Sequence, residues 1–197
     1  SIQLSYKDVG TPRSGTTTSI SIIENFEPGL NVAAYRQERW KELIDVTNPI
    51  TGVSILDKKL VTKTKYYEAG QLVSLQYEWK SEESIAEGGA STVVTYRVIY
   101  EGPGIETEIF TNVIKTTQKI WKEKAMDQPD PLGGASHGAT VVTRIENYEL
   151  GLSDPVSTQE IWKHKEEGRS VTYTLTRELR VAEPTSIQKS YYDSIDT

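Results

Sequence analysis

The sequence contains no cysteine, only one methionine and only two histidines among its 197 residues. Without cysteine, disulfide bonds and thiolate-bound metals are excluded, so burial and hydrogen bonds alone must hold the fold. His137 and His164 are too few for a zinc site built on imidazole ligands. Asp127 and Asp130 offer carboxylates for calcium, but EF-hand spacing is missing, so no metal site is expected.

Long apolar runs are missing as well. No stretch approaches the roughly 20 apolar residues that span a bilayer, and no basic-then-apolar leader opens the chain. We therefore expect neither a membrane span nor a signal peptide, and the compartment stays unassigned. The 22 basic and 28 acidic residues are interspersed and give a net charge of −6. General binding of nucleic acid or anionic membrane needs a basic field, so neither partner is expected.

Catalytic motifs cannot be identified either. No nucleophile elbow is present, and the glycine-rich turns at 88–91, 102–104 and 133–136 lack the lysine and the helix of a phosphate loop. Acidic residues are spread over the whole chain, so no catalytic carboxylate pair stands out. The expectation is a non-enzymatic protein with no catalytic residues and no cofactor.

What the sequence does contain is a repeated hairpin pattern. Residues 117–124 (TQKIWKEK) match residues 158–165 (TQEIWKHK) at six of eight positions. Residues 145–152 (IENYELGL) match residues 23–30 (IENFEPGL) equally well. The tryptophans recur 39, 42 and 41 residues apart, at Trp40, Trp79, Trp121 and Trp162. We predict one domain, residues 1–197, built from approximate units 1–40, 41–79, 80–121, 122–162 and 163–197.

Strand signals dominate every unit. Residues 71–80 and 170–181 alternate apolar and polar side chains with a period of two. Residues 53–65 and 106–124 also suggest strands, the second long enough to need a bulge. Residues 32–42 have a helix-forming composition, but the repeat aligns Trp40 with a strand position. The prediction is an all-β, antiparallel up-and-down meander of about 10–11 strands, closing as a barrel or a folded-over sandwich.

The recurring aromatic residues are the candidate ligand-binding groups. Each tryptophan precedes a lysine and could offer a stacking platform for a sugar or a cation. Tyr100 and Tyr148, like Phe26, precede a glutamate and could combine ring stacking with a hydrogen-bond acceptor. Repeat-equivalent aromatic residues usually pack, so we favour burial for the tryptophans and an aromatic plug for the tyrosines.

The two ends of the chain share a motif. Residues 186–193 (SIQKSYYD) match residues 1–8 (SIQLSYKD) at six of eight positions. The last strand could therefore take, on a neighbouring copy, the place of the first strand, giving a head-to-tail or ring-shaped homo-oligomer. The plainer alternative is a pair of ordinary edge strands kept from duplication.

These features favour a structural or assembly protein that uses sheet surfaces and edge strands for self-association or docking. A virion component, such as a phage tail, fibre, neck or decoration protein, would suit them. The alternative is a β-barrel that binds a carbohydrate or another small ligand, with a glycan as partner. An enzyme comes third.

Overall fold

The computed structural model describes residues 2–10, 18–84, 91–102, 114–125 and 127–192. They form eleven strands: β1 (Ile2–Gly10), β2 (Thr18–Phe26), β3 (Tyr35–Ile44), β4 (Lys59–Glu68), β5 (Gln71–Ser84), β6 (Ser91–Glu101), β7 (Ile114–Ala125), β8 (Thr140–Glu149), β9 (Ser157–Glu166), β10 (Arg169–Glu178) and β11 (Ser186–Tyr192). No helix occurs in these ranges, and so none that is long and apolar enough to cross a membrane.

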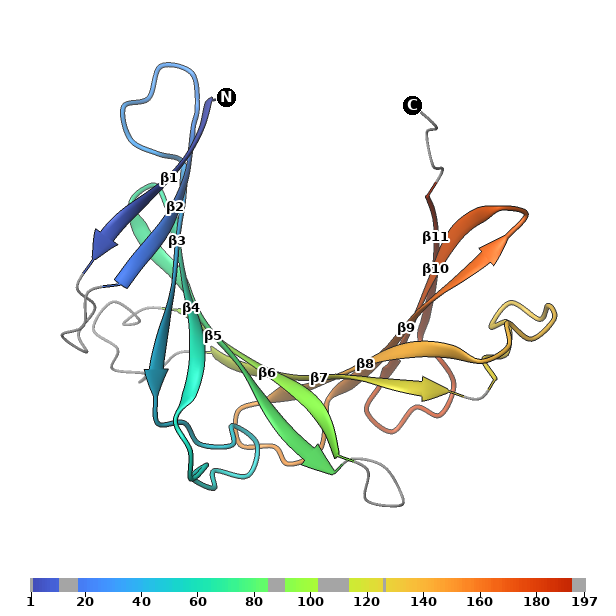
Figure 1. Ribbon diagram of the computed structural model, residues 1–197. Helices are drawn as coiled ribbons and strands as arrows, with labels where there is room; N and C mark the ends of the chain where they lie inside the picture. Colours follow the sequence, from blue (N-terminus) through green and yellow to red (C-terminus); the bar gives the residue numbers. More distant parts are fainter. Residues whose placement is uncertain (1, 11–17, 85–90, 103–113, 126, 193–197) are drawn as a thin grey trace. The chain divides into compact units, whose positions relative to one another are not determined.

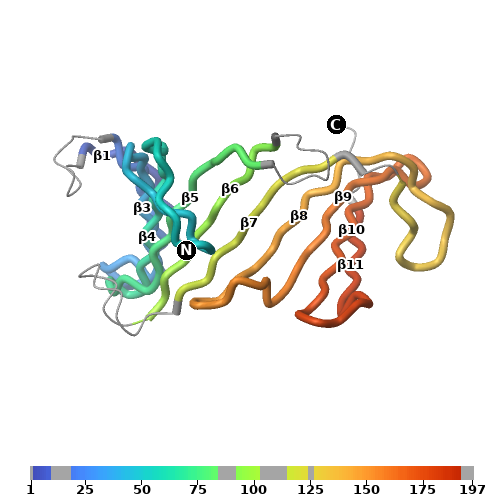
Figure 2. Tube along the Cα trace, turned by 90° about the horizontal axis from the view of Figure 1, so that it is seen from below, coloured from blue at the N-terminus to red at the C-terminus, as the bar shows by residue number. Residues whose placement is uncertain are grey.

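All eleven strands belong to one sheet, in which each strand lies beside its neighbours in the sequence (Figure 1; the Cα trace in Figure 2). The strands run antiparallel in an up-and-down meander. The β1–β2 ladder, for example, pairs Ile2 with Phe26 and Gly10 with Thr18. The prediction of an all-β antiparallel meander is confirmed. Residues 32–42, which had a helix-forming composition, contribute to β3.

Closure of the sheet is not confirmed. Among the described residues, the strand order starts at β1 and ends at β11, which pair only with β2 and β10. An odd number of strictly antiparallel strands offers a physical reason. The first and last strands then run in the same direction, and joining them would require a parallel ladder.

The chain divides into two compact units, which are distinct from the five repeat units predicted from the sequence. Unit 1 comprises Ser1–Ser81 and Tyr96–Thr117, and unit 2 comprises Glu82–Thr95 and Gln118–Thr197. In unit 2 one buried cluster forms the core, consisting of Val142, Trp162, Val171, Tyr173 and Leu175. In unit 1 the most deeply buried apolar side chains include Val61, Leu75 and Tyr96.

Side chains alternate between two faces, as the period of two predicts. In β10, Val171, Tyr173 and Leu175 are buried, whereas the threonines between them are only half-buried. In β3, Trp40 is buried and Lys41 beside it is exposed. We call the side that carries the tryptophans the aromatic face and the opposite side the polar face. In each unit the core lies on the aromatic face.

Two hairpin turns have the same backbone conformation. Ala69–Gly70 joins β4 to β5 with φ values of 45° and 81°, and Glu167–Gly168 joins β9 to β10 with 49° and 83°. Positive φ at both central positions of a two-residue turn is typical of type I′ hairpins, whose twist matches that of the strands. Glycine at the second position adopts this conformation without a steric penalty.

One predicted strand boundary differs from the structure. The strand predicted at 53–65 begins only at Lys59, because residues 45–58 form a loop. Asn48 stabilises this loop, since its Oδ1 accepts hydrogen bonds from the backbone N–H groups of Ile50 and Thr51. The bulge predicted within 106–124 falls partly outside the described residues. That bulge stays a prediction, and a separate register shift is present where Tyr66 and Tyr67 face β5.

Candidate functional site

The four tryptophans lie on alternate strands: Trp40 on β3, Trp79 on β5, Trp121 on β7 and Trp162 on β9. Their exposed fractions are 8%, 6%, 7% and 2%. The prediction that they pack is confirmed. Burial also leaves little of each indole face for a sugar ring to cover, so a row of exposed stacking platforms is not formed.

A longer motif, missed in the sequence, connects these residues. On every odd-numbered strand a glutamine stands three positions before the aromatic residue, at Gln3, Gln37, Gln76, Gln118, Gln159 and Gln188. Aligning the strands on this glutamine makes Tyr6 of β1 and Tyr191 of β11 the equivalents of the tryptophans. These two tyrosines are 43% and 56% exposed. The repeat therefore continues to both edge strands, where its aromatic residue is left uncovered.

Two of the tryptophans form matching pairs with a tyrosine on the next strand. Trp79 and Tyr96 have ring centroids 5.7 Å apart at 30°, and Trp162 and Tyr173 have theirs 5.5 Å apart at 15°. Each tyrosine stands between two buried aliphatic residues on its strand, Val94 and Val98 or Val171 and Leu175. The β5–β6 and β9–β10 hairpins thus repeat one packing arrangement.

In the β9–β10 hairpin, the loop of residues 127–139 supplies a histidine to the pair. The Trp162 indole Nε1–H donates to His137 Nδ1 at 3.2 Å, and the His137 ring lies 4.8 Å from that of Tyr173. The imidazole also stacks on His164 at 4.2 Å and 13°, with its Nε2 3.9 Å from Asp130 Oδ2. The His137 side chain is only 4% exposed. His137 is therefore a packing partner of Trp162 and Tyr173, and His164 packs on His137.

In the β5–β6 hairpin, the loop of residues 45–58 behaves differently. Asn48 Nδ2 donates to the Tyr96 hydroxyl at 3.2 Å. The Trp79 indole Nε1–H is buried without an acceptor among the described residues. A cavity of about 190 Å³ adjoins Trp79 and is also lined by Tyr77, Tyr100 and Lys115. Of the six predicted ligand-binding residues, the structure brings two, Trp79 and Tyr100, to this cavity.

The remaining predicted residues lie elsewhere. The Trp40 and Trp121 Nε1–H groups, like that of Trp79, find no acceptor in the described part of the chain. Tyr148 is buried, and its hydroxyl donates to Glu146 at 2.6 Å. Tyr100 makes an edge contact with Tyr77 at 5.8 Å and packs against Leu72, and burial raises the pKa of its hydroxyl. These contacts agree with the aromatic-plug interpretation, and ligand binding by the six residues stays a prediction.

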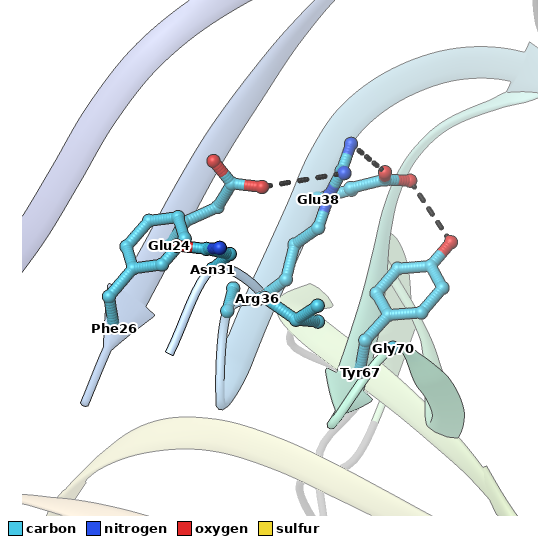
Figure 3. Close-up of a pocket in the computed structure, with 9 residues that line it drawn as sticks. Glu24, Phe26, Asn31, Arg36, Glu38, Tyr67 and Gly70 are labelled. Carbon is cyan, nitrogen blue, oxygen red and sulfur yellow. Dashed lines mark hydrogen bonds and ion pairs between the residues drawn. The ribbon is translucent and has the colours of Figure 1, made fainter. Parts of the chain in front are cut away.

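A second, larger pocket of about 380 Å³ lies at the ends of β2, β3 and β4 (Figure 3). Arg36 at its wall forms ion pairs with Glu24 at 3.4 Å and Glu38 at 2.7 Å. The Tyr67 hydroxyl donates to Glu38 at 3.2 Å. Figure 3 shows these groups directed toward one another rather than toward a common point in the pocket. They serve to connect neighbouring strands.

Ion pairs also connect strands in unit 2. Arg144 of β8 binds Glu123 of β7 and Glu160 of β9, and Glu160 also pairs with Arg177 of β10 at 3.2 Å. The charges of these four residues alternate in sign from strand to strand, so each of the two carboxylates has an arginine beside it. Such cross-strand pairs stabilise the ladder modestly.

The weak metal candidates have local partners. Asp127 accepts a hydrogen bond from the Ser136 hydroxyl, and Asp130 accepts one from the backbone N–H of Leu132. The described residues contain no group of three or more histidine, aspartate or glutamate side chains placed to hold a metal ion. These two carboxylates stabilise their own loop.

Both edge strands carry exposed apolar side chains on the aromatic face. On β1, Ile2, Leu4 and Tyr6 lie on the aromatic face and are 66%, 47% and 43% exposed. On β11, Ile187 and Tyr191 lie on the same face and are 39% and 56% exposed. No other described strand pairs with their outer sides.

Comparison with known protein families, curated proteins and solved structures finds no match to this chain.

Proposed function

We propose that this protein is a non-enzymatic assembly module that joins copies of itself through its edge strands. The observation that carries the proposal is the exposure of Tyr6 and Tyr191, whose tryptophan equivalents on interior strands are 2–8% exposed. An interior strand has a neighbour on each side, and an edge strand lacks one. A partner strand beside β11 would cover Tyr191, and exposed edges are natural sites of strand addition.

The direction of the strands selects the mode of joining. Because β1 and β11 run in the same direction, direct pairing of β11 with β1 of another copy would be parallel and would interrupt the meander. If β11 instead replaces β1 beside β2 of the next copy, the antiparallel order continues. The near-identity of the two strand sequences favours this exchange, which resembles domain swapping.

The register of β1 on β2 tests the fit of β11. In place of Leu4, β11 would bring Lys189 opposite Glu24, adding an opposite charge to the pairing. A hydrogen bond to Glu166 raises the pKa of Lys189, so its ammonium group is charged at neutral pH. Ile187 would replace Ile2 opposite Phe26, and Tyr191 would replace Tyr6 opposite Ile22. The apolar character of the pairing is kept, and its charge complementarity improves.

Light scattering coupled to size-exclusion chromatography tests this function across a concentration series. We expect the protein to form dimers or longer assemblies, and Ile187→Glu to abolish them because a carboxylate would face Phe26. Val141→Glu, at a 55% exposed valine of the interior strand β8, is the control and should still assemble. A native chain that stays monomeric at every concentration would contradict the proposal.

A narrower role in a virion, for example in a phage tail, fibre, neck or decoration layer, stays a prediction supported only by the sequence traits described above. Glycan binding on a row of tryptophans has less support, because the indole faces are buried. Binding of a small ligand has one specific observation in its favour, the cavity beside Trp79.

A further inference from the structure

The cavity beside Trp79 has mostly apolar and aromatic walls. It is lined by residues of the 45–58 loop and of strands β3 to β7, all within unit 1, and has a volume of about 190 Å³. Its walls include Pro49, Val61, Tyr77 and Tyr100. A dry apolar cavity of about 150 Å³ is known to bind benzene, so this one has room for a six-membered ring with a small substituent.

Two hydrogen-bond donors on residues that line the cavity have no partner among the described residues. Trp79 is 6% exposed, and its indole N–H has no acceptor among the described residues. Lys115, half-buried, has no ion pair with any described carboxylate, and desolvation lowers the pKa of its ammonium group. A buried donor without an acceptor and a partly desolvated cation both destabilise the empty site. A ligand with anionic oxygen acceptors would relieve both.

The β9–β10 hairpin shows what such a site accommodates. There the planar ring of His137 lies against Tyr173 and accepts the indole hydrogen bond of Trp162. In the β5–β6 hairpin the corresponding loop directs Asn48 to Tyr96 instead, and the Trp79 donor stays unpaired. In the β9–β10 hairpin the indole N–H of Trp162 thus donates to an aromatic side chain of the protein, His137. In the β5–β6 hairpin a cavity adjoins Trp79.

We propose that this cavity binds a small aromatic monocarboxylate, with its ring against Tyr77 and Tyr100 and its carboxylate accepting hydrogen bonds from Trp79 and Lys115. Asp45 also lines the cavity, but its side chain is exposed, so water screens its charge. No lining residue belongs to β1 or β11, so the site and the proposed assembly are independent of each other.

Titration with benzoate, followed by NMR of the four indole N–H resonances, tests the site. Trp79→Phe identifies the Trp79 resonance, and circular dichroism checks that each variant is folded. We expect benzoate to shift this resonance saturably, with a dissociation constant of about 1 mM or lower. Lys115→Met should weaken benzoate binding about tenfold or more, because a charge-assisted contact is lost.

Two comparisons distinguish the carboxylate contact from nonspecific binding of the aromatic ring. Benzamide, a neutral analogue, should bind the native protein about tenfold more weakly than benzoate and be insensitive to Lys115→Met. Lys80→Met, at an exposed lysine next to Trp79 on the polar face, should leave benzoate binding unchanged. The site is refuted if benzoate produces no saturable shift of the Trp79 resonance. Equal effects of Lys115→Met and Lys80→Met would refute the role given to Lys115.

Discussion

Lys115 carries its ammonium group into a partly apolar setting, because Tyr77, Trp79 and Tyr100 line the same cavity. Desolvation favours the neutral amine, so the pKa of Lys115 is lower in the folded chain than the 10.5 of an ordinary lysine. Below the folded pKa both states are protonated, and the burial penalty is fully present. As pH rises from that value toward 10.5, the folded state releases its proton first and stability rises.

Replacement of this lysine by methionine should therefore stabilise the fold at neutral pH. We expect Lys115→Met to raise the free energy of unfolding by up to about 1 kcal/mol near pH 7, allowing for the solvent that still reaches the ammonium group. The gain should shrink as pH approaches 10.5. Urea unfolding at several pH values measures it, with Lys80→Met as the exposed control. A gain that does not change with pH would contradict the assigned cause.

Burial of individual aromatic residues was predictable from the sequence, whereas their hydrogen bonds were not. The spacing of Trp40 to Trp162 indicates equivalent positions, and equivalent positions share an environment. Whether an indole N–H finds an acceptor depends on a loop that does not repeat. His137 is 25 residues from Trp162 in the sequence, and no local sequence pattern predicts their contact.

At the level of strands and loops, the β5–β6 and β9–β10 hairpins repeat the same tryptophan–tyrosine pair, but the loops that contact these pairs differ. The 127–139 loop buries His137 against Trp162, and the 45–58 loop holds Asn48 against Tyr96. Each loop comes one strand before its hairpin in the sequence. Its Asn48 or His137 contact attaches it to the core on the aromatic face. The loops therefore act as covers for a sheet that has no second layer in the described residues.

Removal of the His137 acceptor should weaken the attachment of the 127–139 loop to the core. His137→Phe keeps a planar ring but leaves the buried Trp162 N–H unsatisfied, so the free energy of unfolding should fall by about 1–3 kcal/mol. Chemical denaturation followed by circular dichroism gives the value. His164→Phe keeps the Trp162–His137 bond and serves as the matched control, with a smaller loss. Equal losses in the two variants would show that ring stacking, not the hydrogen bond, holds the loop.

Strand existence was predictable from alternation and turn residues, but some boundaries were not. Residues 53–58 contain Val53, Ile55 and Leu56 and read as the start of a strand, yet the Asn48 turn keeps them in the loop. The turn depends on side-chain acceptors that compete with the ladder for backbone N–H groups. Composition also favoured a helix at 32–42, and the sheet neighbours on both sides of β3 override it.

At the scale of the whole molecule, the sequence predicts one meander with related ends, and the strand order agrees. Closure could not be predicted, since it depends on the exact number of strands, which the repeat leaves at ten or eleven. With eleven, β1 and β11 have the same direction and the same exposed aromatic position. We therefore expect β11 of one copy to fit the place of β1 on the next.

Disulfide cross-linking can report this fit of β11 beside β2, since the native chain has no cysteine. In the proposed register Ser190 replaces Ser5 opposite Ile23, and residues directly opposite in an antiparallel pair are close enough for a disulfide. Under dilute conditions that keep the copies apart, Ser5→Cys/Ile23→Cys should cross-link within one chain and serves as the geometric control. Mild oxidation of Ser190→Cys/Ile23→Cys should give a ladder of covalent oligomers on a non-reducing gel. Monomers alone, while the control pair forms its internal bond, would contradict the exchange of β11 for β1.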